Sequence, residues 1–260
     1  MSRLADLGGK ALSLVRLREA GFDVPDFVVL PTAEYRAFVS ETGLGPVIAA
    51  ALRGLHERNT ELVSNTIRAA FSVSEMSDAQ RARIAAAISP LRDADLAVRS
   101  SAVTEDLPDA SFAGQQDTYL NVPHDQVFRR IIDCWASLWT ARSIDYRLRH
   151  GIGSHDLALA VVIQSMVDAD ASGVLFTANP LTGHRGQRVV ESVSGLGNKL
   201  VSGAVTPDRF IVESGEIISR QAGELPSITD LHVRALSDLG SRIETALGSP
   251  QDIEWVRVAD

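Results

Sequence analysis

Cysteine is almost absent from this sequence, since Cys134 is the only one among 260 residues. A single cysteine excludes a disulfide within the chain, so a reducing compartment is expected. No apolar run reaches the roughly 18 residues that a membrane-spanning helix needs. The N-terminus, MSRLADLGGK, also lacks the apolar core of a secretory signal. These absences favour a cytoplasmic protein.

The chain has no excess of basic residues either: 25 Lys and Arg stand against 33 Asp and Glu, which gives a formal net charge of -8. Non-specific binding to nucleic acid or to an anionic membrane needs a basic surface, so neither is expected as a partner. With 45% hydrophobic and 22% charged residues, the composition is typical of a globular protein. The length suffices for one large domain or for two lobes.

A cation and two hydroxyls follow a short apolar strand at residues 96–98. They are Arg99, Ser100 and Ser101, and a polar loop comes after them. The guanidinium fork of Arg suits phosphate oxygens, and Ser hydroxyls complete such a cradle. The pattern therefore indicates a phosphate site, and the alternative is an Arg in a surface salt bridge beside an ordinary polar turn.

A glycine pair and a lysine, Gly8-Gly9-Lys10, open the first helical pattern, which runs over residues 11–20. Two glycines allow close approach of the backbone, and a helix N-terminus offers free N–H groups to an anion. Lys10 is then a phosphate-binding candidate. The alternative is a solvated lysine on a flexible loop.

Strand and helix patterns alternate along the chain, which predicts an α/β (α+β) fold. A helix is expected over residues 125–150, and the run at 151–154 is the best candidate for a break. We therefore expect an N-terminal lobe at residues 1–150, with the phosphate-contacting loops, and a C-terminal lobe at 151–260. The apolar run at 157–166 predicts a strand buried on both faces, ending near Gln164, Met166 and Val167.

Two acids lie two residues apart in a strand predicted at residues 252–258. The period of two places Asp252 and Glu254 on one face and Ile253 and Trp255 on the other. Paired carboxylates suit a hard cation such as Mg²⁺, which also keeps phosphates and waters in its shell. The alternative is an exposed strand face with two solvated acids.

Residues 99–102 and 105–115, together with 134–142, carry a resemblance to a known family. They look like the ATP-binding domain shared by phosphoenolpyruvate synthase, rifampicin phosphotransferase and, more distantly, pyruvate phosphate dikinase. The resemblance implies a two-lobed ATP-grasp-like nucleotide-binding fold. It also implies that Lys10 contacts ATP phosphates and that Glu254 binds magnesium. Asn198 stands where the family usually has an acid, which leaves a charge-dependent role there in doubt.

The same resemblance implies that the segment from Gln164 to Val167 hinges the lobes and holds adenine, with Met166 as an apolar wall. The implied activity is phosphoryl transfer from ATP, with magnesium, to a histidine on a swivelling carrier domain. Lys10 and Arg99 would neutralise phosphate charge in the transition state. The final acceptor stays open among pyruvate, an antibiotic and other metabolites.

Family members continue into a strand that ends in Gln-Ser-Arg-Pro, whose glutamine binds metal and whose arginine binds phosphate. We therefore expect the second lobe to be truncated at its end and the histidine carrier to be supplied in trans, so that this chain alone cannot run the whole reaction. An alternative function is a catalytically incomplete nucleotide-binding or regulatory interaction module that acts with a partner protein. A fragment or split subunit is the third interpretation.

Overall fold

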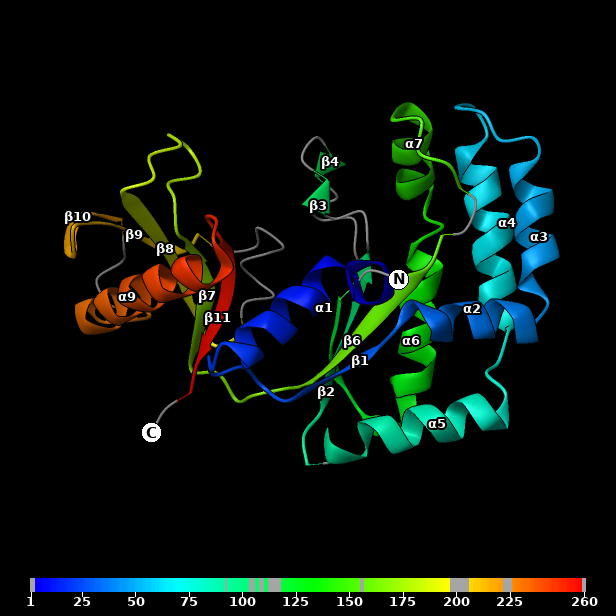
Figure 1. Ribbon diagram of the computed structural model, residues 1–260, viewed down its shortest axis with the longest axis horizontal. Helices are drawn as coiled ribbons and strands as arrows, with labels where there is room; N and C mark the ends of the chain where they lie inside the picture. Colours follow the sequence, from blue (N-terminus) through cyan, green and yellow to red (C-terminus); the bar gives the residue numbers. More distant parts are fainter. Residues whose placement is uncertain are drawn as a thin grey trace. The chain divides into compact units, whose positions relative to one another are not determined.

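The computed structural model describes residues 3–91, 93–102, 106–107, 110–111, 118–154, 157–196, 206–221 and 226–258. The chain divides into two compact units, one made of Met1–Arg18 and Asp23–Met166 and the other of Glu19–Phe22 and Val167–Asp260 (Figure 1). Each unit contains an antiparallel sheet and helices, which confirms the predicted mixed α/β class. Within the described residues, no helix is both long and apolar enough to cross a membrane.

The first unit is built on a four-stranded sheet in the order β1-β6-β2-β5. Its strands are β1 (Phe27–Leu30), β2 (Leu96–Ala102), β5 (Thr118–Val122) and β6 (Leu159–Ser165), and a separate two-stranded ladder joins β3 (Asp106–Leu107) and β4 (Ala110–Ser111). Its helices are α1 (Arg3–Glu19), α2 (Thr32–Glu41), α3 (Leu44–Leu52), α4 (Thr60–Val73), α5 (Asp78–Ile88), η1 (Ser89–Leu91), η2 (His124–Gln126), α6 (Val127–Ser137) and α7 (Ala141–Arg149).

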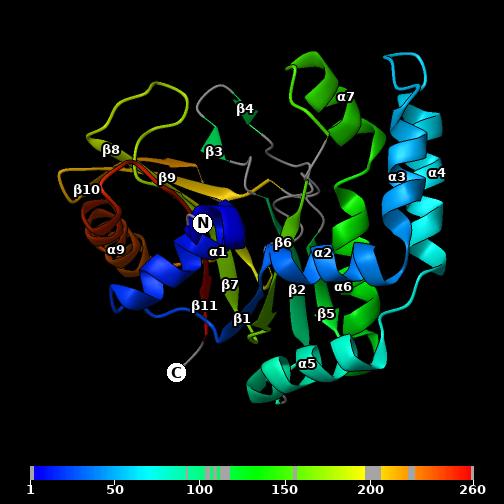
Figure 2. The same cartoon turned by 45° about the vertical axis from the view of Figure 1, so that its right-hand side comes forward.

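Helices cover both faces of this sheet (Figures 1 and 2). On one face, Val98 and Ile163 join the large hydrophobic core formed with α2, α4 and α6. On the other face, Ala11 and Val15 of α1 pack with Val162. Because both faces are covered, β6 is apolar along most of its length, as the sequence predicted.

The second unit contains a five-stranded antiparallel sheet in the order β10-β9-β8-β7-β11 and one long helix. Trp255 on β11 faces Gly173 on β7, and a Cβ atom at Gly173 would lie 2.8 Å from the Trp255 ring and 1.8 Å from the Glu191 carbonyl oxygen. A glycine is therefore required there. The elements are β7 (Ala171–Phe176), β8 (Gln187–Ser194), β9 (Asp208–Glu213), β10 (Glu216–Gln221), α9 (Asp230–Leu247) and β11 (Asp252–Arg257).

Some boundaries differ from the predictions. The single helix expected over residues 125–150 is wrong: α6 and α7 are separate, because Thr140 caps a new helix by accepting a hydrogen bond from the Ser143 N–H. Strand β6, which the sequence analysis assigned to the lobe beginning at residue 151, pairs with β1 and β2 of the first unit. The chain passes into the second unit between Met166 and Val167.

The core of the first unit contains a buried phenol beside a buried cation. The Tyr35 hydroxyl accepts a hydrogen bond from Trp139 Nε1 at 3.0 Å. Arg147 donates from Nη1 to the Leu138 carbonyl at the end of α6, at 2.9 Å, where the helix dipole favours a positive charge. Both Tyr35 and Arg147 are only 3% exposed. Burial raises the pKa of Tyr35 to about 12 and lowers the pKa of Arg147 to about 10.

The variant Tyr35→Phe should lose less stability at alkaline pH than the unmodified chain. An unfolded Tyr ionises near a pKa of about 10, whereas folded Tyr35 stays protonated to about 12. Its contribution is therefore complete below pH 10 and is lost as the pH rises to 12, on the order of 2 to 3 kcal/mol. Arg147, whose folded pKa is lowered, acts with the opposite sign between pH 10 and its unfolded pKa. Urea unfolding at pH 7, 10 and 12 measures the difference, and identical pH profiles would contradict the assignment.

Candidate functional site

The side chain of Ser101, on β2, bridges two backbone groups of α1 that would otherwise bond to each other. The helix is kinked at Gly8, which has φ 73° and ψ 169°. The Ser101 hydroxyl accepts a hydrogen bond from the Ala11 N–H at 3.0 Å and donates one to the Leu7 carbonyl at 2.9 Å. Ala11 and Leu7 are four residues apart, so this hydroxyl replaces a direct N–H to C=O bond of the helix. It thereby fastens the Gly8-Gly9-Lys10 segment to the strand that carries Arg99.

The close approach needs a glycine at position 8. A Cβ atom there would lie 2.3 Å from the Ser101 carbonyl oxygen, and the positive φ is itself unfavourable for other residues. Lys10 follows directly and is partly exposed. The two motifs that the sequence analysis selected, about ninety residues apart, therefore meet in the first unit.

Arg99 lies inside β2, whereas the sequence predicted a shorter strand with Arg99 at the turn beyond it. It faces Val162 on β6 and Thr118 on β5. Residues two apart in a strand share a face, so Arg99 and Ser101 are on the same side of the sheet. Val162 packs with α1, which identifies this side as the α1 face. Arg99 is partly exposed.

Ser100 is not brought together with Arg99. It is fully buried and, by the alternation of the strand, points away from the α1 face. Thr118, which the sequence analysis did not consider, lies directly opposite Arg99 and is exposed. The strand that holds it was missed, although its composition, Thr-Tyr-Leu-Asn-Val, is rich in strand-forming residues.

Gln164 belongs to the same face as Arg99, because it follows Val162 by two residues on β6. Its side chain is 8% exposed and donates from Nε2 to the Pro25 carbonyl at 3.3 Å. Met166 and Val167 come directly after this strand and are partly exposed, and the Met166 N–H donates to the Asp95 carbonyl at 2.8 Å. These residues occupy the junction between the two units along the chain.

The alternation predicted for residues 252–258 is confirmed in β11. Asp252 and Glu254 are exposed, whereas Trp255 is buried in the core of the second unit. The carboxyl group of Asp252 is partly buried, which raises its pKa. Glu254 faces Val174 on β7, and Val174 in turn faces Glu191 on β8. Two acids thus flank Val174 on one sheet face.

Glu191 is a further acid that the sequence analysis did not select. It forms an ion pair with Arg209, whose Nε lies 3.7 Å from Glu191 Oε1. Among the described residues, no group of three or more His, Cys, Asp or Glu side chains is close enough together to hold a metal ion. A cation at this face would accordingly need further oxygen ligands.

Parts of the predicted site lie outside the described residues. They include Gly114 and Gln115, which end the family-like stretch at residues 105–115, and Asn198.

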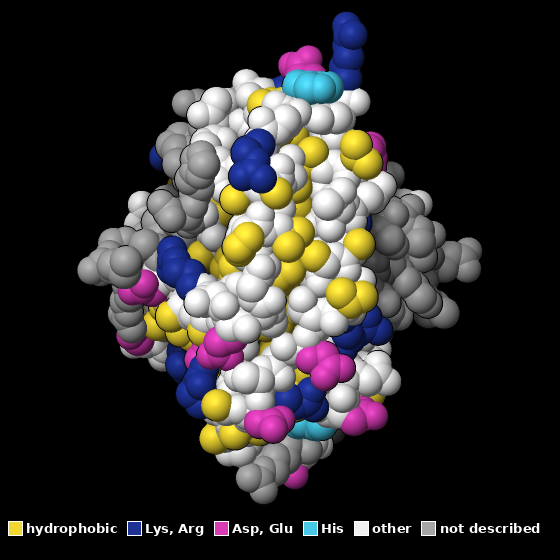
Figure 3. All heavy atoms as spheres, turned by 90° about the vertical axis from the view of Figure 1, so that its right-hand side faces the viewer, with side chains coloured by type: hydrophobic (Ala, Val, Ile, Leu, Met, Phe, Trp, Pro, Cys, Tyr) yellow, Lys and Arg dark blue, Asp and Glu magenta, His cyan; other side chains and the backbone are white. Residues whose placement is uncertain are grey.

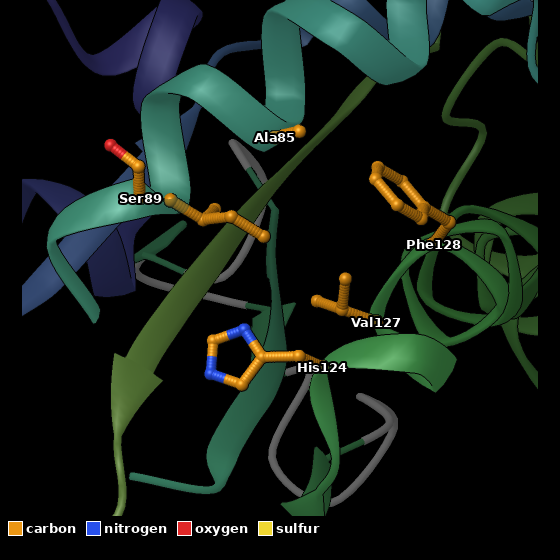
Figure 4. Close-up of a pocket in the computed structure, with 6 residues that line it drawn as sticks. Ala85, Ser89, His124, Val127 and Phe128 are labelled. Carbon is orange, nitrogen blue, oxygen red and sulfur yellow. The ribbon is translucent and has the colours of Figure 1, made fainter. Parts of the chain in front are cut away.

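A hollow of about 370 Å³ lies elsewhere in the first unit, between α5 with η1 and η2 with α6. Figure 4 shows His124, Val127 and Phe128 on one side of it and Ala85 and Ser89 on the other. His124 Nε2 is 3.1 Å from the Ala94 carbonyl oxygen. The lining contains no Lys, Arg, Asp or Glu and none of the residues predicted to bind ATP. This hollow is therefore unsuited to a polyphosphate.

The chain matches the family described as pyruvate phosphate dikinase, AMP/ATP-binding domain, over residues 4–225. It belongs to this family, and the resemblance found in the sequence is confirmed. Membership of the family implies the use of ATP.

Curated relatives match nearly the whole chain. It is 39% identical over 283 residues to a probable phosphoenolpyruvate synthase from Archaeoglobus fulgidus, covering 96% of this chain and 38% of the relative. A probable phosphoenolpyruvate synthase from Methanocaldococcus jannaschii is 36% identical, covering 95% of this chain and 24% of the relative. A rifampicin phosphotransferase from Streptomyces sviceus is 39% identical, covering 100% of this chain and 33% of the relative. The chain thus spans less than two fifths of each of these proteins.

The variant Gly8→Ala should destabilise the first unit by about 2 to 4 kcal/mol, from the unfavourable positive φ together with the clash against Ser101. Gly43→Ala is the matched control in the same unit, because Gly43 also has a positive φ, +70°, but nothing lies within 4 Å of its added Cβ. The control should lose only about 1 to 2 kcal/mol. Urea unfolding measures both variants. An equal loss in the free energy of unfolding would show that the contact between position 8 and β2 does not require a glycine.

Proposed function

We propose that this chain is an ATP-binding domain that transfers a phosphoryl group from ATP, with magnesium, to a histidine on a carrier domain or protein. The observation that carries the proposal is the Ser101 bridge, which ties the Lys10 segment to the strand of Arg99. Two cations held on one side of a sheet suit a polyphosphate. The names of the relatives, phosphoenolpyruvate synthase and rifampicin phosphotransferase, support phosphoryl transfer.

Lys10 and Arg99 have different roles in this proposal. The Lys10 ammonium acts as a mobile point charge, whereas the Arg99 guanidinium binds phosphate oxygens through its planar fork. Phosphoryl transfer depends mainly on positioning and on stabilising charge as it moves to the leaving oxygen. The step breaks a P–O bond of ATP and forms a P–N bond to the histidine of the carrier, and AMP leaves with the displaced oxygen. Water then cleaves the remaining P–O–P linkage, so that the products are AMP, phosphate and the phosphorylated carrier. Ser101 contributes by holding the lysine segment in place.

Glu254, with Asp252, would hold the magnesium ion. Their carboxylate oxygens are the ligand type that Mg²⁺ prefers, and they lie on the exposed face of β11. A site with only one or two carboxylates fits this ion, because it fills its shell with waters and substrate phosphates. When bound, magnesium would neutralise phosphate charge.

Gln164, Met166 and Val167 would seat the adenine. Backbone N–H and C=O groups beyond the end of a strand can pair with the edge of a base, and Met166 would supply an apolar contact. We further propose a cytoplasmic reaction, in line with the single, buried Cys134. The carrier, the final acceptor and the swivelling motion all belong to this proposal.

A second candidate is a nucleotide-binding or regulatory module that is catalytically incomplete. It is supported by the family description, which names AMP/ATP binding. Calorimetry with ATP and magnesium tests nucleotide binding by this chain alone. Conversion of ATP to AMP with a supplied histidine-carrier protein distinguishes the enzyme from the module.

The variant Arg99→Ala should weaken binding of ATP with magnesium at least tenfold and reduce transfer to the carrier by several powers of ten, because charge stabilisation is lost. Arg83→Ala is the matched control. Arg83 is a half-exposed arginine of the same unit, paired with Glu34 at 3.3 Å, and its loss should change little. Calorimetry and a carrier-phosphorylation assay provide the measurements. Unchanged ATP turnover in Arg99→Ala would refute the assignment.

The variant Glu254→Gln should raise the magnesium concentration needed for half-maximal ATP binding about 10- to 100-fold. Binding of ATP without magnesium should stay the same, because the carboxylate then contributes no ligand. Glu216→Gln, on the exposed strand β10, is the control. A magnesium titration that is identical in all three proteins would exclude Glu254 as a ligand.

A further inference from the structure

Ala94 and Asp95 precede β2 and belong to no helix or strand. The first residue of β2, Leu96, lies opposite Ser165 at the end of β6 and opposite Val122 at the end of β5. Both ladders stop at Leu96, so they do not hold the two residues before it. A stretch of chain outside helices and strands keeps a fixed position only through other hydrogen bonds and packing.

One such hydrogen bond reaches the proposed adenine seat. The Met166 N–H donates to the Asp95 carbonyl at 2.8 Å. Continued by one residue, the register of β2 and β6 pairs Asp95 with Met166, so this bond extends the ladder past the end of β6. The orientation of the Met166 backbone therefore depends on where the Asp95 carbonyl lies.

On the other side of β2, the backbone cannot extend the ladder in the same way. Continued by one residue, the register of β2 and β5 places Pro123 opposite Asp95, and proline has no N–H to donate. The next residue supplies a donor from its side chain instead, since His124 Nε2 lies 3.1 Å from the Ala94 carbonyl oxygen. A carbonyl oxygen only accepts, so the imidazole donates through its Nε2–H.

The His124 ring has space beside it. It borders the hollow of about 370 Å³ between α5 and α6 and is partly exposed (Figure 4). Packing therefore restrains only part of the ring, and the hydrogen bond to Ala94 fixes its orientation. A ring of similar size without the N–H can occupy the same space.

We propose that His124 is a positioning residue for the adenine seat. Its imidazole holds the Ala94 carbonyl, the adjoining Asp95 carbonyl holds the Met166 N–H, and the Met166 backbone is thereby oriented before nucleotide binds. His124 acts through the backbone and does not contact the nucleotide. The inference rests on the proposed function, because it concerns the seat that Met166 would form for adenine.

The phosphate end of the proposed site is held by a different contact. The Ser101 hydroxyl fastens the Lys10 segment to the strand of Arg99. Loss of the His124 hydrogen bond should therefore affect the adenine end alone. Inorganic tripolyphosphate has no adenosine and reports on the phosphate end, whereas ATP reports on both ends.

Calorimetry with ATP and with inorganic tripolyphosphate, each with magnesium, tests this role. His124→Phe keeps a ring without a donor and should weaken ATP binding about five- to tenfold, the effect of one lost hydrogen bond, while tripolyphosphate binding stays the same. His124→Gln should bind ATP within about twofold of the unmodified chain, because its amide N–H can reach the same carbonyl. Equal weakening of both ligands, unchanged ATP binding in His124→Phe, or no recovery with glutamine overturns the proposal.

Hydrogen exchange at the Met166 amide tests the hydrogen bonds without any nucleotide. The exchange rate should rise about tenfold in His124→Phe, whereas the amide of Ile163, in the middle of β6, should keep its rate and so verify that the unit is folded. Unchanged exchange at Met166 overturns the positioning role. An unmodified chain that binds neither ATP nor tripolyphosphate overturns the proposed function, and the role of His124 toward adenine with it, whereas the exchange result still decides whether His124 holds Met166.

Two controls change residues of the same unit that lie outside these contacts. His150→Phe is matched, because His150 Nδ1 lies 2.8 Å from the Tyr146 carbonyl oxygen within its own helical turn. Leu62→Ala changes a side chain that is 68% exposed on α4, on the side of the molecule where Figure 3 shows hydrophobic side chains along the middle. Both controls should keep the ATP affinity and the Met166 exchange rate of the unmodified chain. Changes equal to those of His124→Phe would assign the effect to a general loss of stability and overturn the proposal.

Discussion

A single hydroxyl group organises the candidate site. Ser101 takes the place of a backbone hydrogen bond in α1, and the helix can therefore kink at Gly8 without leaving the Ala11 N–H or the Leu7 carbonyl unsatisfied. Buried backbone groups must be paired, so the kink and the strand are mutually dependent. The lysine segment and the strand of Arg99 are thereby held together, although their separation in the chain is large. The proposed phosphate site depends on this contact.

Much of the fold could be predicted from periodicity and capping residues. Strand β11 begins at residue 252, where it was predicted, because Gly248 ends the preceding helix. The alternation of Asp252 and Glu254 also followed from the sequence, since an edge strand packed on one side shows a period of two. Family resemblance added the expected roles of these residues.

Other features could not be read from local pattern. Strand β2 continues through Arg99 to Ala102 because β6 and α1 cover these polar residues, a tertiary effect that the sequence alone does not reveal. For the same reason the face of Ser100 was not predicted. Thr118 and Glu191 were missed because each becomes notable only through its partner across the sheet. The junction at Met166 depends on which strands β6 pairs with, and pairing is not a local property.

The glycine at position 173 has a consequence for misfolding. Trp255 can lie over β7 only where a side chain is missing, so the ring marks one alignment of the last strand. A shift by one residue would turn Asp252 and Glu254 toward the helix-covered interior and expel the indole to water. The Trp255 indole therefore disfavours the shifted register of the final strand, in which the two carboxylates would be buried.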